Sequence, residues 1–330
     1  MFYTLAKLAI FIHTKVSSYQ EYCYLCAILS KNTNMANLKQ ASISKSRSYT
    51  ACLSEAHKML FDNIKLIFSK TWIYSAVLAL LTAAYTSLCI HAGLYGDSVA
   101  VYVWIGVTCI ATLCAEVAYL AKIISLINGR SMKWNVVRCA KIMFCYLCFC
   151  AFLTLIYTAA TYLTIFAKQP VMLAELQPMF LIFGASLLVI ALLLLPYVYI
   201  FMKYLMEPEC KLRRIIFKSY CTGMRYWGLT FIAMLLTVLC TAVCATLVSL
   251  PALIVMAANA FSVFGVNFLG DPTGLPSYFG TIQFVVFALS AFICLYINIF
   301  TIFVCYFLYG SIETREREKK KFMNELQTKA

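Results

Sequence analysis

The chain has 330 residues, of which 63% belong to the set AVILMFWYC and only 12% are Asp, Glu, Lys or Arg. A soluble domain has about half of its residues apolar and roughly a quarter charged, so this composition excludes a single soluble core and indicates lipid as the solvent. The formal charge of +14 would suit a nucleic-acid partner, but the basic residues lie in short clusters between apolar runs. That distribution is typical of segments beside a membrane, so the predicted partner is a bilayer with anionic head groups and not a nucleic acid.

Six apolar windows are each long enough to cross a hydrocarbon layer of ~30 Å, which takes about 20 helical residues. The predicted fold class is therefore all-α: a polytopic membrane helix bundle with six transmembrane helices. The fourth window contains Pro196 and Lys203, so it could stop earlier than its drawn end. The windows are residues 71–93, 99–124, 142–167, 178–205, 228–258 and 281–309.

The basic residues also predict the orientation. All but one of the 27 Lys and Arg residues precede the first span, follow the last, or flank the second-to-third and fourth-to-fifth connections. Only Lys168 falls on the other side, together with Asp97, Glu175 and Asp271. Because Lys and Arg in short loops stay on the cytoplasmic side, both termini are predicted to be cytoplasmic. The predicted location is the plasma membrane, the inner membrane of a bacterium.

Short basic amphipathic stretches lead into three of the spans, which predicts interfacial helices and three units of interfacial helix, span, outer turn and span. In the first stretch Leu60, Ile64 and Ile67 share a face, and the middle stretch lies around Trp134 and Val137. In the third, apolar residues recur every four positions at Leu212, Ile216, Tyr220 and Met224. Its predicted head-group contacts are Arg213, Arg214, Lys218 and Arg225.

The two ends of the chain differ from the apolar middle, so three regions are predicted: an extension over 1–58, the transmembrane domain over 59–310 and a tail over 311–330. Residues 1–58 are polar and interrupted by charges, which predicts a flexible tail or a wrongly assigned upstream start, with Met59 as a more natural one. A regulatory cytoplasmic segment is the alternative. In the tail, the i,i+4 pairs of Glu313 with Arg317 and Glu316 with Lys320 predict a charged cytoplasmic helix.

Glu116 is the only acidic residue well inside a predicted span. A charged side chain at the bilayer centre costs about 2.5 to 3.5 kcal/mol on insertion scales. Glu116 is therefore either a coupling carboxylate that faces the bundle interior, or a neutral or paired group in the cytoplasmic half of its helix. Asn298 and Gln283 are further intramembrane polar candidates, and hydrogen bonds across helices are their expected role.

The connection over 259–280 combines three Phe residues with several Gly and Pro residues. It could re-enter the bundle, where protein or a water-filled cavity must cover the backbone, or lie on the outer surface with its Phe residues at the head groups. Surface attachment is the favoured prediction. Pro251 and Pro196 are expected to kink their helices.

Enzyme signatures are few. The 16 cysteines fall largely inside apolar stretches, and Cys23 with Cys26 forms a lone CxxC without a second pair. The sequence has no HExxH, no Gly-rich phosphate loop and no GxSxG. We therefore predict no metal, no cofactor and no enzymatic activity.

The last third of the chain combines Arg225-Tyr226-Trp227-Gly228, a long span, a Gly/Pro-rich loop and a final span that ends in Tyr306-Phe307-Leu308-Tyr309. This pattern resembles the poorly characterised multi-span membrane domain found alone or attached to glycerophosphodiester phosphodiesterases. The resemblance implies a membrane bundle and brings no active-site residues. Two functions remain open: a non-enzymatic membrane scaffold or accessory subunit, with a protein partner or a second copy, and a small-solute or proton-coupled transporter that uses Glu116.

Overall fold

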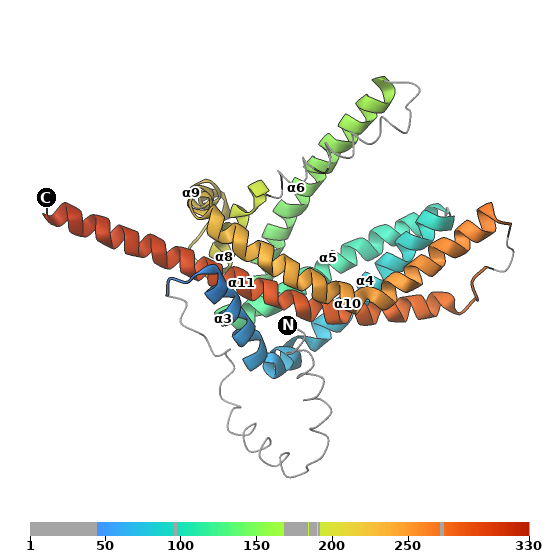
Figure 1. The fold of residues 1–330 in the computed structure, drawn as a ribbon, viewed down its shortest axis with the longest axis horizontal. Coiled ribbons are helices and arrows are strands. Elements are labelled where there is room, and N and C mark those ends of the chain that lie inside the picture. Colours follow the sequence, from blue (N-terminus) through green and yellow to red (C-terminus); the bar gives the residue numbers. More distant parts are fainter. Residues whose placement is uncertain are drawn as a thin grey trace, which may run out of the picture. The chain divides into compact units, whose positions relative to one another are not determined.

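The computed structural model describes residues 45–95, 98–167, 192–270 and 274–329, with the single positions 184 and 190. Within these ranges the chain forms eight helices, α3 to α6 and α8 to α11, and contains no β-strand (Figure 1). The all-α prediction is confirmed for this part of the chain.

Five of the helices are long and apolar enough to cross a membrane. Each contains one predicted span, and at about 1.5 Å per residue the shortest of them, at 30 residues, is about 45 Å long. The fourth predicted span, 178–205, is described continuously only from residue 192, and its second half contains α8 (Pro196–Met206) within a shorter apolar helical stretch over 192–206. The five are α4 (Ile64–Tyr95), α5 (Val99–Asn128), α6 (Met132–Ala167), α10 (Trp227–Phe268) and α11 (Phe279–Lys329).

Small residues are among those buried where the long helices meet, and many large apolar side chains of these helices lie outside. α4 contacts α5 and α11, and α11 also contacts α10. Ala79 and Ala83 of α4 are buried, whereas Trp104, Leu155 and Ile254 are each at least 60% exposed on α5, α6 and α10. Small residues at helix contacts and large apolar residues outside are what a bundle in lipid requires, because lipid solvates the apolar surface.

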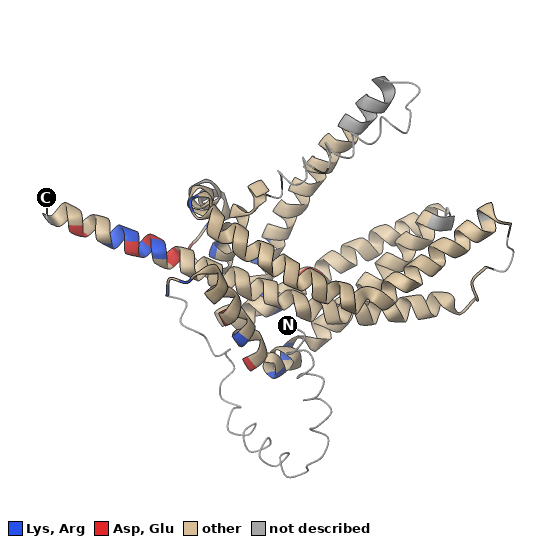
Figure 2. Ribbon diagram, viewed as in Figure 1, with Lys and Arg blue, Asp and Glu red and all other residues tan. Residues whose placement is uncertain are grey.

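The longest run of buried residues in the described part of the chain lies on α11, in residues 303–312. Phe303, Phe307 and Ser311 are at most 1% exposed. α3 (Tyr49–Asp62) and α8 both pack on α11. The helix then continues without a break into the charged residues of the tail, as Figure 2 shows.

α3 crosses the boundary that the sequence placed at residue 58. Ser48 is its N-cap, and the Ser48 Oγ accepts a hydrogen bond from the Ala51 amide at 3.3 Å. Cys52 and Ala56 of α3 are fully buried. Residues 49–58, which the sequence grouped with the extension, therefore form most of a packed helix.

The predicted interfacial stretches differ from one another in the structure. The first is split at Asn63, where α3 ends and α4 begins; Ile67 is buried and Ile64 is 44% exposed, so the predicted common face was wrong. The middle stretch is no separate helix, because α6 runs unbroken from Met132. Only the third is a separate amphipathic helix, α9 (Leu212–Arg225).

The side of α9 that packs against the protein is distinct from the predicted apolar stripe. Ile215, Ser219 and Gly223 face inward, whereas Met224 of the predicted apolar stripe is 42% exposed. The reason is a close approach to α8, since a Cβ on Gly223 would lie 2.9 Å from the Pro196 Cβ. The small residues Ser219 and Gly223 therefore permit a close contact with the protein, and Met224 lies outside it.

The predicted connection over 259–280 is mostly helical. α10 continues to Phe268, with Pro251 inside the helix, and α11 begins at Phe279. Phe261 and Phe268 are both 75% exposed on this extension of α10, so residues 259–268 form neither a re-entrant loop nor a surface-lying loop. Gly265 does not end the helix, because its carbonyl still accepts from the Leu269 amide at 3.0 Å.

Candidate functional site at one end of the bundle

The four segments with most of the basic residues contact one another. The N-terminal segment meets the tail where the Arg47 amide donates to the Ser311 Oγ, and that hydroxyl donates to the Arg47 carbonyl, both at 3.0 Å. The guanidinium of Arg315 donates to the same carbonyl at 2.7 Å. Figure 2 shows that the charged residues of α11 gather in the half that leads to the C-terminus.

A network of five side chains joins α8 to α11. Two carboxylates share one ammonium: Lys203 Nζ lies 3.2 Å from Glu313 Oε2 and 3.7 Å from Glu207 Oε1. Each carboxylate also accepts a tyrosine hydroxyl at 2.9 Å, Tyr199 to Glu313 and Tyr309 to Glu207. We call these five residues the Lys203 network.

The local sequence builds this network by helical spacing. Tyr199, Lys203 and Glu207 recur every four residues around α8, and Tyr309 and Glu313 have the same spacing on α11. The tyrosine near the start of each run bonds the carboxylate near the end of the other, so the two helices pair antiparallel here. Burial alone would raise the pKa of Glu313, which lies beyond the predicted span. Lys203, the Tyr199 hydroxyl and Arg317 together hold the pKa below its ordinary value.

Arg138 of α6 forms hydrogen bonds at the C-terminal end of α8. Its guanidinium donates to the carbonyls of Tyr204 and Glu207, and to those of Pro208 and Cys210. Its Cζ lies 4.2 Å from the centroid of the Trp134 ring and 4.4 Å from that of Tyr204. The last carbonyls of a helix lack partners within the helix, and Arg138 donates to one of these, that of Tyr204, and to three carbonyls that follow α8. Arg138 is therefore itself paired, although it is only 9% exposed.

The chemistry of these groups is structural. Cys210 donates its thiol to Glu207 Oε2 at 2.9 Å, and burial together with that carboxylate raises the pKa of the thiol to about 11. The thiol is therefore protonated at neutral pH and is a poor nucleophile. In the described ranges, no three His, Cys, Asp or Glu side chains come together as metal ligands.

The structure does not bring the predicted intramembrane residues together. Glu116 lies exposed on α5, near Tyr146 of α6, and makes no hydrogen bond or ion pair with any described residue. Asn298 is exposed on α11. Gln283 is buried and accepts a hydrogen bond from Asn259 of α10.

The predicted head-group contacts all belong to α9. Arg225 is 54% exposed and pairs with Glu316 at 2.9 Å, so it also ties α9 to α11. The side chains of Arg213, Arg214 and Lys218 lie outside the described part of the structure.

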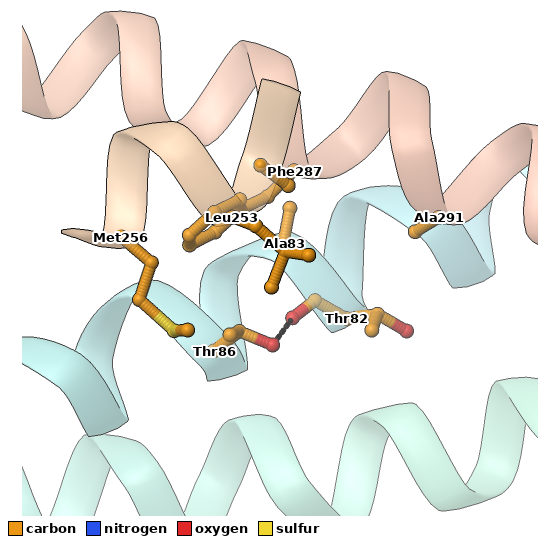
Figure 3. Close-up of a pocket in the computed structure, with 8 residues that line it drawn as sticks. Thr82, Ala83, Thr86, Leu253, Met256, Phe287 and Ala291 are labelled. Atoms are coloured by element: carbon orange, nitrogen blue, oxygen red, sulfur yellow. Dashed lines mark hydrogen bonds between the residues drawn. The ribbon is translucent and has the colours of Figure 1, made fainter. Parts of the chain in front are cut away.

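A pocket of about 220 Å³ lies between α4, α10 and α11 (Figure 3). Its only polar lining residues are Thr82 and Thr86, and the Thr86 hydroxyl donates to the Thr82 carbonyl of its own helix at 2.8 Å. Neither Glu116 nor Gln283 lines it. Such an apolar cavity suits hydrocarbon better than a polar solute. The other lining residues are Ala83, Ala252, Leu253, Met256, Phe287 and Ala291.

Sequence reasoning missed the Lys203 network and the role of Arg138. A signal was present in the four-residue spacing of Tyr199, Lys203 and Glu207 and of Tyr309 and Glu313, but nothing in the sequence paired one run with the other. Comparisons of the chain with family models, with curated proteins and with solved structures gave no match.

Proposed function

We propose that this chain is a non-enzymatic membrane scaffold or accessory subunit of the bacterial inner membrane, with six transmembrane helices and both termini in the cytoplasm. The observation that carries the proposal is the pairing at one end of the bundle. There the charged side chains bind helix ends and one another instead of lining a cavity, which is how a protein fixes a shape.

The contacts between the basic segments support the orientation. Arg47 bonds Ser311, Arg138 bonds carbonyls at residues 204–210, and Lys203 binds Glu313. Segments in direct contact lie on one side of the bilayer, and the positive-inside rule makes that side the cytoplasm.

The same contacts support a sixth span. α6 starts beside the end of α8, because Arg138 bonds the carbonyls there, and it then runs through 36 residues to Ala167. The chain is back at this end by residue 196, where α8 begins. If the chain crosses the bilayer again within the predicted span 178–205, the end of α6 and the start of α8 can lie on opposite sides.

The resemblance to the membrane domain associated with glycerophosphodiester phosphodiesterases remains a proposal, and the structure gives its motif residues physical roles. Pro196 has no amide hydrogen, so the Leu192 carbonyl lacks its usual donor, and Trp227 Nε1 donates to that carbonyl at 3.1 Å. Arg225 binds Glu316. Both motif residues stabilise the packing of α9 and α10 against neighbouring helices.

A proton- or cation-coupled transporter is the second candidate, because the Glu116 carboxylate is exposed on a membrane helix without a described partner. The purified full chain in proteoliposomes that enclose a pH-sensitive dye would separate the two functions. The scaffold proposal predicts the same proton leak as in empty liposomes, for both wild type and Glu116→Gln. A pH-driven flux that Glu116→Gln abolishes, and that Glu325→Gln in the exposed tail leaves intact, would contradict it.

A further inference from the structure

The turn between α5 and α6 is held rigidly by two asparagines. Asn128 Nδ2 donates to Asn135 Oδ1 at 2.8 Å, and Asn135 Nδ2 donates back to Asn128 Oδ1 at 3.3 Å. The Arg130 amide donates to Asn128 Oδ1 at 2.9 Å, and the Arg130 carbonyl accepts from Asn135 at 3.4 Å. Gly129, with φ of 66°, ends α5 in the left-handed conformation. The backbone of Arg130 is thus fixed independently of its side chain.

The Arg130 guanidinium has no carboxylate partner among the described residues. Its Cζ lies 4.5 Å from the Trp134 ring centroid, and Arg138 stacks on the same ring at 4.2 Å. Arg130 Nη1 is buried and has no hydrogen-bond acceptor among the described residues. No described carboxylate forms a salt bridge with either arginine, whereas Lys203, Arg225 and other cations at this end are paired with Glu side chains.

Two adjacent guanidinium groups repel each other, and a buried donor without an acceptor is costly. Arg138 gives four hydrogen bonds to carbonyls, so it contributes mainly positive charge here. The Arg130 guanidinium donates no hydrogen bond to a described residue, and its planar fork matches phosphate oxygens. An anion beside Arg130 would offset the repulsion between the two guanidinium groups.

We propose that the α5–α6 turn binds a phosphate group, held by Arg130 on Trp134 in the positive field of Arg138. A phosphodiester in an anionic lipid head group and a free phosphate offer the same chemistry. The lipid source rests on the proposed membrane topology, which places this turn at the cytoplasmic surface, and the free-phosphate source does not.

The test uses the full chain in neutral maltoside micelles and follows thermal unfolding during titration with phosphatidylglycerol, phosphatidylcholine or inorganic phosphate at constant ionic strength. Arg130→Gln removes the fork and leaves the asparagine contacts in place, because these use only the Arg130 backbone. Arg130→Lys keeps the charge without the fork. Lys141→Gln removes an exposed charge from α6, the helix that follows the turn, and is the matched control.

We expect phosphatidylglycerol to raise the melting temperature of the wild type and of Lys141→Gln, and phosphatidylcholine, whose phosphodiester is offset by the choline cation, to raise it less. Arg130→Gln should weaken the apparent affinity about tenfold, the equivalent of one charge-assisted hydrogen bond, with Arg130→Lys in between. A rise with inorganic phosphate that equally depends on Arg130 would support the site and identify free phosphate as the ligand.

Two results would overturn the site: no stabilisation by either phosphate source, or equal stabilisation of the wild type and Arg130→Gln. Either result would leave the scaffold proposal standing, because that proposal is tested by flux in proteoliposomes.

Discussion

Replacing Lys203 with Met should destabilise the protein strongly, because it leaves two mostly buried carboxylates without their shared cation. The side chains of Lys203 and Glu313 are each 20% exposed, and that of Glu207 is 32% exposed. Breaking a fully buried ion pair costs about 3 to 5 kcal/mol. Allowing for the partial exposure, we expect a loss of about 2 to 3 kcal/mol.

The exposed pair of Arg225 with Glu316 provides the matched control. The Arg225 side chain is 54% exposed, so Arg225→Met should cost less than about 1 kcal/mol. The assay is equilibrium unfolding in micelles by a denaturing detergent, applied to both single variants. Adding Glu313→Gln to Lys203→Met should recover up to about 1 kcal/mol, because it removes a mostly buried carboxylate whose one remaining cation is the exposed Arg317, 3.6 Å away, while the Tyr199 hydroxyl keeps an acceptor. Equal losses in Lys203→Met and Arg225→Met, or no recovery in the double variant, would refute this reasoning.

The same network predicts a pH dependence. The folded-state pKa of Glu313 lies below its ordinary value of 4.5, so its contribution is fully present above about pH 4.5. It is lost as the pH falls through the lower folded-state value. In Lys203→Met the main attraction is gone and burial raises the pKa, so the acid-side loss attributable to Glu313 should shrink or reverse. An unchanged acid profile in Lys203→Met would argue against the network.

Two further predictions concern packing. Gly223→Ala should cost about 1 to 3 kcal/mol, because the new Cβ would lie 2.9 Å from the Pro196 Cβ. Gly228→Ala, where a Cβ meets nothing within 4 Å, should be neutral or slightly stabilising in the same unfolding assay; similar losses at both glycines would contradict the close approach of α8 and α9. Burial raises the pKa of the Cys52 thiol to about 11, against the lowering effect of nearby arginines. At pH 8 a maleimide should therefore modify a variant that retains only the exposed Cys221, and it should not modify a variant that retains only Cys52. Rapid modification of folded Cys52 would show that α3 is not packed as described.

The apolar spans could be predicted from the sequence because hydropathy over about 20 residues is a local property. Five of the predicted windows lie inside long helices. The ends were less predictable, since helical hydrogen bonding carried α10 past Gly265 to Phe268 and since α3 depends on its contacts with α10 and α11.

The candidate site was harder to predict, because its pairs join distant parts of the chain. Tyr199 bonds Glu313 across 114 residues, and Arg138 bonds Glu207 across 69. The side of α9 that packs against α8 could not be predicted, because it depends on Gly223 meeting Pro196, a contact that the hydrophobic pattern does not contain. Glu116 was a candidate because a charged side chain is costly in lipid, but that cost does not indicate which way the side chain points.

Side-specific thiol labelling would test most directly the claim that the basic segments share the cytoplasmic side. On a cysteine-free background, Ser131→Cys, Glu209→Cys and Lys320→Cys place single exposed thiols on the α5–α6 turn, the α8–α9 turn and the tail, and Ser98→Cys places one between α4 and α5. We predict that an impermeant maleimide labels the first three only in inverted vesicles and Ser98→Cys only from outside intact cells. Labelling of any of the first three from outside, or of Ser98→Cys together with them, would contradict the account.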